Sequence, residues 1–283
     1  MLNWTLDFAA VGPQRTATTW LYQALYGHPS LCFPQGVKET FFFDERYAKG
    51  LDWYRAHFAY HQPGQACAEM APTYFDVAAV PQRLHAHNPH CRIVVTLRHP
   101  VARTWSLYRH HLAKGRVTDS FEAATQQMPR ILTAGHYATH LPRWLDAFGA
   151  EQVKCLLLDD IQTAPEAALQ ALCQFLEISV PEESANHHTP VNAATTPRSP
   201  QLARLATQAA SLLRAYRLHA PIEWGKRLGL KRIYSGGSPH RAPQLTPERQ
   251  QQLLARYEPD VRYLEDLLGR DLTAWRQPIP TQE

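Results

Sequence analysis

Residues 8–21 read Phe8-Ala9-Ala10-Val11-Gly12-Pro13-Gln14-Arg15-Thr16-Ala17-Thr18-Thr19-Trp20-Leu21. A short apolar run ends in glycine and proline, and a basic residue and three threonines follow before an apolar helical pattern begins. This order predicts a strand, a tight loop and a helix. Such a loop directs several backbone N–H groups toward one point, where the helix dipole favours an anion.

The side chains of this loop fit phosphate or sulfate oxygens. Arg15 brings a permanent charge and a fork of donors, and the threonines bring hydroxyl groups. The loop is not a Walker A loop, because Ala17 stands at the second glycine position and Thr18 at the lysine position. An ordinary strand-to-helix turn with a threonine N-cap is the alternative interpretation.

The composition limits the functional classes. The 283 residues carry a net charge of +4 and are 45% hydrophobic, which suits a globular protein with an anionic ligand but gives no argument for nucleic acid. We see neither a signal peptide nor an apolar run of transmembrane length. The five cysteines contain no CxxC pair, so we expect reduced thiols in a cytoplasmic protein. The paired histidines lack partners at ligand spacing, and we expect no metal site.

A second candidate segment is Val37-Lys38-Glu39-Thr40-Phe41-Phe42-Phe43-Asp44. Three aromatic residues follow the Lys38–Glu39 pair, so Glu39 is expected at the edge of an apolar region. Burial raises the pKa of a carboxyl group and makes it a better general base. The alternative is a surface ion pair beside a core strand.

A third candidate lies after the β-branched run at residues 91–97, which predicts a buried strand. Arg98 stands at its carboxyl end, where parallel α/β sheets bind ligands. Ser106 comes about two turns into the following helix, so the two side chains can share an anion. Taken singly, Arg98 also suits a helix-entry ion pair and Ser106 an ordinary helix position.

Residues 231–241 form a basic, glycine-bearing stretch that suits a second phosphate or, alternatively, a flexible linker. Together the three anion-binding features describe a ligand with two separated phosphates. With these features the chain resembles the sulfotransferases that use 3′-phosphoadenosine-5′-phosphosulfate. The resemblance is strongest to the branch of heparan sulfate N-deacetylase/N-sulfotransferases and 3-O-sulfotransferases. The resemblance rests on residues 12–19, on Lys38-Glu39 with Phe42-Phe43-Asp44 and Gly50–Tyr54, and on Arg98-His99-Pro100 through Ser106.

The resemblance implies one α/β sulfotransferase domain over residues 1–283, with a central parallel sheet flanked by helices and a P-loop-like 5′-phosphosulfate loop. Residues 178–245 are expected to be an insertion that shapes the acceptor and 3′-phosphate sites. Glu39 and Arg15 would be catalytic, and Lys38, Phe41, Trp53 and Tyr74 would contact the acceptor, although core packing is the alternative for the aromatic residues. The donor would be bound by Gly12, Pro13, Gln14, Arg15, Thr16, Ala17, Thr18, Thr19, Trp20, Arg98, Ser106, Tyr234, Ser235, Gly236, Gly237, Ser238, His240 and Arg241.

The implied reaction is in-line sulfuryl transfer to a hydroxyl or amine of a small-molecule, carbohydrate or natural-product acceptor. Two departures from the family pattern concern charge: Arg15 replaces a usual lysine, and Met70 replaces a lysine expected near the acceptor. Arginine is effectively never deprotonated, so Arg15 would act only electrostatically. A P-loop-type kinase and a non-enzymatic binder of adenosine bisphosphate are the alternatives. His57, His110 and His111 compete with Glu39 as the base.

Overall fold

The computed structural model describes residues 4–181 and 244–280. Its centre is an all-parallel sheet of five strands in the order β2-β3-β1-β4-β5. The strands are β1 (Phe8–Gly12), β2 (Leu31–Cys32), β3 (Ala66–Met70), β4 (Arg92–Leu97) and β5 (Val153–Leu157). This confirms the predicted α/β class with a central parallel sheet.

The central strand is β1, where Phe8 lies opposite Ala68 of β3 and Arg92 of β4. All five of its residues are buried. Helices cover both faces of a parallel sheet, so its inner strands are apolar on both sides. The loop that follows β1 therefore starts from the most enclosed part of the fold.

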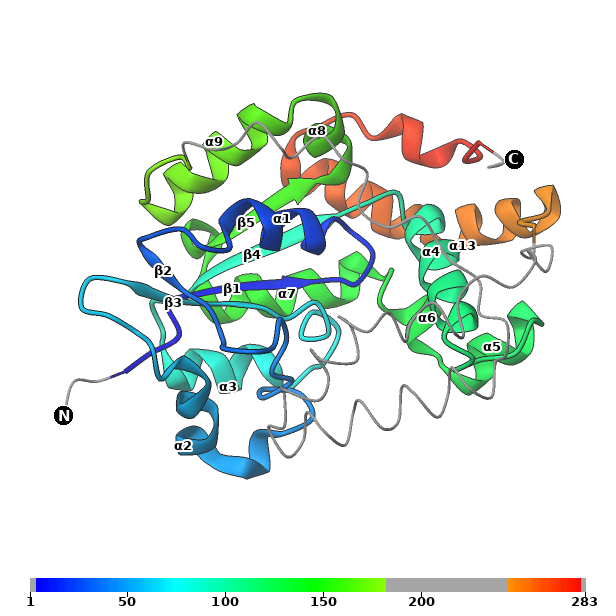
Figure 1. The fold of residues 1–283 in the computed structure, drawn as a ribbon. Helices are drawn as coiled ribbons and strands as arrows, with labels where there is room; N and C mark the ends of the chain where they lie inside the picture. The colour runs from blue at the N-terminus through cyan, green and yellow to red at the C-terminus, as the bar shows by residue number, and fades with distance from the viewer. Residues whose placement is uncertain (1–3, 182–243, 281–283) are drawn as a thin grey trace, which may run out of the picture.

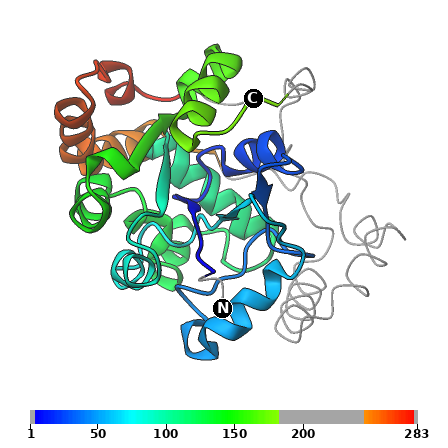
Figure 2. The same ribbon diagram turned by 90° about the vertical axis from the view of Figure 1, so that its left-hand side faces the viewer.

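Helices lie on both faces of the sheet (Figures 1 and 2). One face carries α1 (Thr18–Leu25), α8 (Leu158–Thr163) and α9 (Pro165–Leu176), which pack on alternate strand residues such as Phe8 and Ala10. The other carries α2 (Gly50–Arg55), α3 (Val80–His87), α7 (Tyr137–Phe148) and part of α13 (Pro247–Leu268), which pack on Ala9 and Val11. The two-residue period of a strand accounts for this division.

Further helices extend the fold on the side where β1 and β4 end (Figure 1). They are α4 (Pro100–Ala113), α5 (Phe121–Gln127) and α6 (Arg130–Thr133). In other parts of the chain, short 3₁₀ turns lie at Tyr47–Lys49, Ala56–Phe58, Ala150–Gln152 and Thr273–Arg276. A third apolar cluster joins α4 to α13 through Leu107, Tyr108 and Tyr257. No helix in the described residues is long and apolar enough to cross a membrane.

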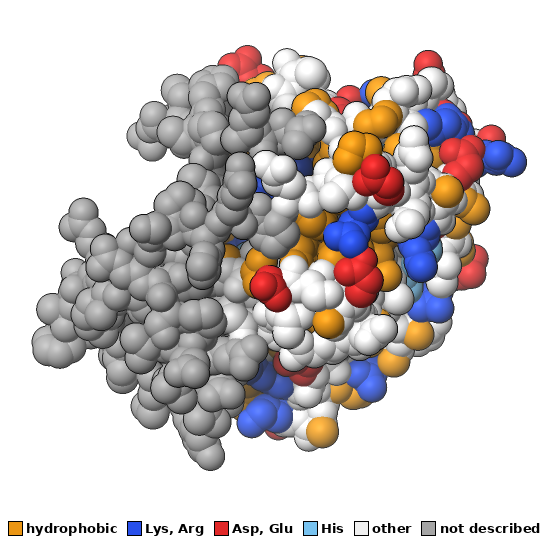
Figure 3. All heavy atoms as spheres, turned by 90° about the vertical axis from the view of Figure 1, so that its right-hand side faces the viewer, with side chains coloured by type: hydrophobic (Ala, Val, Ile, Leu, Met, Phe, Trp, Pro, Cys, Tyr) orange, Lys and Arg blue, Asp and Glu red, His pale blue; other side chains and the backbone are white. Residues whose placement is uncertain are grey.

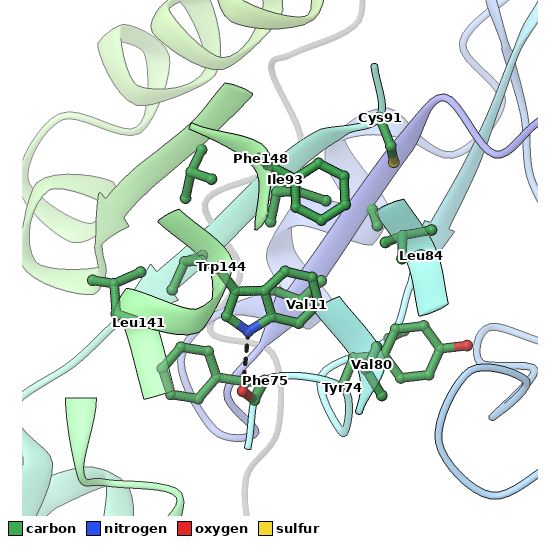
Figure 4. Packing of buried hydrophobic residues seen from close by; sticks show 14 of the residues in the cluster. Val11, Tyr74, Phe75, Val80, Leu84, Cys91, Ile93, Leu141, Trp144 and Phe148 are labelled. Atoms are coloured by element: carbon green, nitrogen blue, oxygen red, sulfur yellow. Dashed lines mark hydrogen bonds between the residues drawn. The ribbon is translucent and has the colours of Figure 1, made fainter. Parts of the chain in front are cut away.

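Trp144 of α7 is the largest fully buried side chain. It packs among Val11, Ile93 and Phe75, and its indole N–H donates to the carbonyl oxygen of Phe75 at 3.0 Å (Figure 4). A buried indole needs such a partner, because an unpaired donor in the core is costly. This hydrogen bond holds the chain after β3 against α7.

The predicted strand over residues 91–97 is confirmed by β4. The sequence did not indicate β2, whose two residues are too few for a periodic pattern. The last strand, β5, ends at Leu157, and α8 begins directly after it at Leu158. The proposed insertion at 178–245 lies almost entirely outside the described residues.

Candidate functional site

The loop after β1 begins at a glycine that no other residue can replace without a shift of the backbone. Gly12 has a φ of +99°, and a Cβ placed on it would lie 2.5 Å from the carbonyl oxygen of Pro72. Both the left-handed conformation and the close approach demand glycine. The turn after β3 is thereby packed directly against the start of the loop.

Two non-glycine residues of the loop have left-handed backbone conformations. Arg15 has a φ of +73° and Ala17 a φ of +77°, which is strained for residues with a Cβ. Ala17 is the N-cap of α1, and no side chain caps that helix. The alternative of a turn with a threonine N-cap is therefore wrong, and the first N–H groups of α1 keep their capacity for an anion.

The threonines of the loop have different surroundings. Thr16 is fully buried, and its hydroxyl group bonds to the carbonyl oxygen of Pro13 and to the hydroxyl of Thr96. Thr16 therefore ties the loop to the end of β4, and its hydroxyl is already used within the protein. Thr18 is buried and Thr19 is partly exposed.

Arg15, Ser106 and Arg98 lie together at the carboxyl end of β4. The Nε of Arg15 donates to the Oγ of Ser106 at 3.0 Å, and the Nη1 of Arg98 donates to the carbonyl oxygen of Arg15 at 3.3 Å. The backbone of Arg98 is fixed in turn by the buried Tyr137, whose hydroxyl donates to its carbonyl oxygen at 2.7 Å. The end of β4 and the second turn of α4 thus meet the loop after β1.

These two guanidinium groups form a positively charged site. Within residues 4–181 and 244–280, neither Arg15 nor Arg98 forms an ion pair with a carboxylate. Burial lowers the pKa of Arg15, with Arg109 adding to the effect. Burial likewise lowers the pKa of Arg98, with Arg15 as the next cause. A bound anion would relieve both effects.

Lys38 lies next to Thr19, in the first turn of α1. Its Nζ lies 3.4 Å from the Oγ1 of Thr19 and 5.7 Å from the centre of the Tyr22 ring. Burial lowers the pKa of Lys38, Glu39 raises it, and Arg15 lowers it. Lys38 therefore adds a cationic side chain from a third segment at the first turn of α1.

Glu39 is a desolvated carboxylate next to this cluster. Burial raises its pKa to about 7, against the lowering effect of Lys38, and Glu69 raises it further. In the described part of the chain its carboxylate accepts no hydrogen bond and forms no ion pair. Its side chain is only partly exposed. A carboxyl group with a pKa near neutrality and no fixed partner can exchange a proton with a substrate.

The aromatic residues predicted to contact an acceptor differ in exposure. Tyr74 is fully buried and belongs to the core, the alternative that the sequence left open. Phe41 and Trp53 are partly exposed. The guanidinium of Arg46 lies 5.5 Å from the ring centre of Phe41 and 5.8 Å from that of Trp53, so both rings stay at the surface of the segment that carries Glu39.

The competing histidines are poor candidates for a base. His57 is buried, with its Nδ1 3.0 Å from the carbonyl oxygen of Trp53. Burial and then Lys114 lower the pKa of His110 to about 2. Burial and then Arg116 lower the pKa of His111 to about 3. Such weak bases accept a proton far less readily at neutral pH than Glu39.

Two cations near the site were not predicted, namely Arg109 and Lys114. Arg109 lowers the pKa of Arg15, and Lys114 lowers that of Glu39. Arg109 lies one helical turn after Ser106 in α4, and Lys114 directly follows the last residue of that helix, Ala113. The spacing of Arg109 from Ser106 was a signal available in the sequence, whereas no regular spacing indicated Lys114.

The predicted second phosphate loop cannot be placed. Its residues Tyr234, Ser235, Gly236, Gly237, Ser238, His240 and Arg241 lie outside the described residues.

Among residues 4–181 and 244–280, no group of three or more histidine, cysteine, aspartate or glutamate side chains could hold a metal ion. On the face drawn in Figure 3, acidic and basic side chains of the described residues lie side by side.

Comparison with known proteins assigns the family. The profile of the sulfotransferase domain family matches residues 6–194. The chain belongs to the sulfotransferase domain family. The matched range includes the loop after β1, Glu39, Arg98 and Ser106, and this family uses 3′-phosphoadenosine-5′-phosphosulfate as donor.

Two relatives have the sulfotransferase domain within much longer chains. The bifunctional heparan sulfate N-deacetylase/N-sulfotransferase of Drosophila melanogaster is 32% identical over 212 residues, which cover 64% of this chain and 20% of the relative. The human bifunctional heparan sulfate N-deacetylase/N-sulfotransferase 2 is 33% identical over 195 residues, or 61% of this chain and 22% of the relative. The sulfotransferase thus spans about a fifth of the length of these curated relatives.

A solved structure supports the fold over nearly the whole chain. The sulfotransferase from Alicyclobacillus acidocaldarius is similar with a TM-score of 0.68 at 23% identity, covering 96% of this chain and 98% of the other. At this identity the likeness establishes the shared fold. The family match confirms the resemblance first seen in the loop and the strand ends.

Proposed function

We propose that this enzyme transfers a sulfuryl group from 3′-phosphoadenosine-5′-phosphosulfate to a hydroxyl or amine of its acceptor, with Glu39 as the general base. The observation that carries the proposal is the pair of guanidinium groups of Arg15 and Arg98, joined through the loop backbone and Ser106. A donor with phosphate groups at both its 3′ and 5′ positions supplies the negative charge that these groups lack.

The loop after β1 is suited to the 5′ end of the donor. The first N–H groups of α1, which no side chain caps, and the guanidinium of Arg15 would hold the phosphosulfate oxygens. Lys38, whose Nζ is 3.4 Å from the Oγ1 of Thr19, would stabilise the charge that grows on the departing phosphate oxygen. Arg15 keeps its proton throughout and contributes only its charge and hydrogen bonds.

Arg98 and Ser106 are suited to the 3′-phosphate. Arg98 follows the carboxyl end of β4, where ligands of parallel α/β sheets bind, and Ser106 of α4 accepts a hydrogen bond of 3.0 Å from Arg15. Recognition of the 3′-phosphate separates this donor from ATP. Residues 234–241 would complete the contact, as the sequence predicts.

Glu39 has the properties of the base in this reaction. As the acceptor oxygen or nitrogen forms its bond to sulfur, its proton passes to the Glu39 carboxylate, while the bond from sulfur to the phosphate oxygen breaks and adenosine 3′,5′-bisphosphate leaves. A pKa of about 7 places the carboxylate close to the ideal strength for this transfer. Positioning of the two reactants supplies the remainder of the catalysis.

The acceptor would meet the surface beside Glu39. Phe41 and Trp53 are partly exposed there, with Arg46 between their rings. An aromatic and cationic surface suits a carbohydrate or a natural product that bears rings and polar groups. Heparan sulfate, the carbohydrate for which both relatives are named, is an acceptor of this kind.

The experiment is a thermal denaturation series with adenosine 3′,5′-bisphosphate, carried out with EDTA and without magnesium. At a ligand concentration one hundred times the dissociation constant, binding should stabilise the folded state by about 2.7 kcal/mol. ATP with magnesium serves as the comparison. Equal stabilisation by ATP–Mg²⁺, with none by the bisphosphate, would favour a P-loop-type kinase and overturn the proposed donor.

Binding alone does not establish transfer, so a second experiment separates an enzyme from a binder. Incubation with the ³⁵S-labelled donor and a panel of sugars, phenols and alcohols should yield a labelled acceptor and an equal amount of adenosine 3′,5′-bisphosphate. Bisphosphate binding without labelling of any compound in a broad panel would support the non-enzymatic alternative.

A further inference from the structure

Glu69 is a fully buried carboxylate near the end of β3. Its Oε1 accepts a hydrogen bond of 2.7 Å from the backbone N–H of Thr40. Its Oε2 accepts from the hydroxyl of Tyr54 at 2.7 Å and from that of Tyr74 at 3.1 Å. Three donors from three different segments therefore converge on this side chain.

The geometry requires an acceptor at this position. A backbone N–H can only donate, and the hydroxyl oxygen of Tyr74 already accepts the N–H groups of Phe42 and Phe43 at 3.0 and 3.1 Å. The proton of Tyr74 must then point to Glu69. An ionised carboxylate satisfies all of these donors, whereas an amide in its place would turn an NH₂ group toward one of them.

A buried anion of this kind is expensive for stability alone. Among the described residues no cation forms an ion pair with Glu69, and burial raises its pKa against the lowering effect of its hydrogen bonds from Thr40, Tyr54 and Tyr74. Packed apolar side chains would stabilise a core at least as well. The carboxylate is therefore better explained by what it holds in place.

What Glu69 holds is the backbone that carries Glu39. Thr40, which donates to Glu69, is the next residue in the chain. Its carbonyl oxygen accepts from the Nη1 of Arg46 at 2.9 Å, and the carbonyl oxygen of Phe43 accepts from the Nη1 of Arg83 at 2.7 Å. The segment after Glu39 is thus fixed by side chains although it forms no strand or helix.

We propose that Glu69 is a positioning residue for Glu39. Its buried carboxylate orients the 39–43 backbone through its hydrogen bonds from Thr40 and Tyr74. The inference rests on the proposed role of Glu39 as the base, and it assigns to the same site a second carboxylate that does not contact substrate.

Some of the charged groups near Glu39 raise its pKa and others lower it. After burial, Lys38 lowers its pKa, Glu69 raises it, Lys114 lowers it and Asp44 raises it. Glu69 is the larger of the two acidic contributions and the only one of the two that is fully buried. Removal of its charge should leave the two lysines less opposed, and Glu39 should then lose its proton at lower pH.

The test is the titration of Glu39 in the full chain, measured by NMR with ¹³C-labelled glutamate carboxyl groups. The Glu39→Gln protein identifies the resonance. In the Glu69→Gln protein the midpoint for Glu39 should fall below its value in the unmodified protein, which we expect near 7. A folded Glu69→Gln protein with an unchanged midpoint for Glu39 would overturn the proposal.

Asp260→Asn is the matched control. Asp260 is also a buried carboxylate, and it accepts from the backbone N–H of Ala138 at 2.9 Å and from the Nδ1 of His136 at 3.0 Å. Its replacement should lower stability in the same way without changing the titration of Glu39. An equal change in both variants would mean that the effect is a general loosening of the fold and would refute a specific role for Glu69.

The unmodified protein provides a measurement should Glu69→Gln fail to fold. The amide proton of Thr40 should resonate far downfield and exchange slowly, because it is bonded to a buried carboxylate. Its chemical shift should move together with the Glu39 carboxyl resonance as pH is varied. Fast exchange of this amide, as in an exposed loop, would contradict the inference.

These outcomes separate the inference from the proposed function. The midpoint of Glu39 can be measured whether or not Glu39 is the base, and Glu69 makes no contact with Arg15 or Arg98. Bisphosphate binding should therefore remain within about twofold in the Glu69→Gln protein. A chain that fails to bind the bisphosphate refutes the donor, while the Glu39 titration still decides the role of Glu69.

Discussion

The Nε of Arg15 donates a hydrogen bond of 3.0 Å to the Oγ of Ser106, a residue 91 positions later in the chain. The bond joins the loop after β1 to the second turn of α4. It also orients the guanidinium of a residue with a left-handed backbone, whose φ is +73°. The two parts of the proposed donor site therefore depend on one another.

The first prediction concerns this link. Ser106→Ala removes the acceptor of Arg15 and a hydroxyl donor for the 3′-phosphate. We expect the affinity for adenosine 3′,5′-bisphosphate to fall by about 1–2 kcal/mol, or roughly 5- to 30-fold. Stability should change little, because Ser106 is partly exposed and its partner can bond to water. Isothermal titration calorimetry measures the first effect and thermal denaturation the second.

Ser120→Ala provides the contrast for Ser106. Ser120 caps α5, where its Oγ accepts from the backbone N–H of Ala123 at 3.3 Å. Its replacement should cost about 1 kcal/mol of stability and leave bisphosphate affinity unchanged. If Ser106→Ala behaved like Ser120→Ala, the serine would be a structural residue of α4.

The second prediction concerns Arg98. Arg98→Ala should weaken bisphosphate binding by about 1.5–3 kcal/mol, or roughly 10- to 150-fold, since a charged hydrogen bond to phosphate is lost. The rate of the bound complex should change much less, because the 3′-phosphate is remote from the reacting sulfur. A variant with normal affinity and reduced turnover would place Arg98 at the reacting centre instead.

Arg92→Ala is the matched control for Arg98. Arg92 begins the same strand, β4, at its opposite end, and it pairs with Glu177. That partly exposed pair should contribute little to stability. Bisphosphate affinity should remain unchanged in this variant, which separates a general loss of positive charge from the loss of the Arg98 contact.

The fold and part of the site could be predicted because they depend on local patterns. The β-branched run of β4 indicated a buried strand, and a parallel strand places the residue after it, Arg98, at the edge where ligands bind. Ser106 followed from helical spacing. The order of apolar run, glycine, basic residue and threonines was sufficient to predict the strand, loop and helix around Arg15.

Other parts of the site depend on contacts between distant segments and could not be predicted. Thr16 and Thr19 have the same chemistry in the sequence, yet the hydroxyl of Thr16 bonds to Thr96 and that of Thr19 lies near Lys38. Glu69 receives donors from positions 40, 54 and 74. No periodicity in the sequence relates those positions to one another.

The third prediction concerns strain at Ala17, whose φ is +77°. The left-handed conformation costs about 1–2 kcal/mol for a residue with a Cβ, and glycine loses about 0.5–1 kcal/mol of that gain through its greater freedom in the unfolded chain. Ala17→Gly should therefore stabilise the protein by up to about 1 kcal/mol, as measured by urea denaturation.

Ala123→Gly tests whether the effect of Ala17→Gly is specific to the backbone conformation. Ala123 is an exposed residue of α5, where glycine is destabilising by about 1 kcal/mol. We expect opposite signs for the two substitutions. A loss of stability in both variants would mean that the loop tolerates Ala17 without strain.

The last prediction concerns Glu39, whose replacement should reduce catalysis but increase stability. Glu39→Gln keeps the size of the side chain but cannot accept a proton. Turnover should fall by about 10²–10⁴-fold, while bisphosphate affinity is retained. In the unmodified protein, turnover should rise with pH through about 7 as the carboxyl group ionises, and this acidic limb should disappear in the variant.

The stability of the same variant provides an independent measurement. The pKa of Glu39 is about 7 in the folded protein, against an ordinary value of 4.5, so the folded state holds its proton more tightly than the unfolded state. This group therefore lowers stability as pH rises from about 4.5 to 7. One pH unit between the two pKa values is worth about 1.4 kcal/mol, which gives up to about 3 kcal/mol above pH 7.

Glu39→Gln removes that penalty, so the variant should be more stable than the unmodified protein at pH 8 and equally stable at pH 4. Glu45→Gln, at an exposed position six residues later, should show neither the gain nor the loss of turnover. If Glu39 were held in a structural ion pair, the variant would instead be less stable at pH 8. A gain in stability together with a loss of turnover is the combination expected of a catalytic carboxylate kept in a desolvated position.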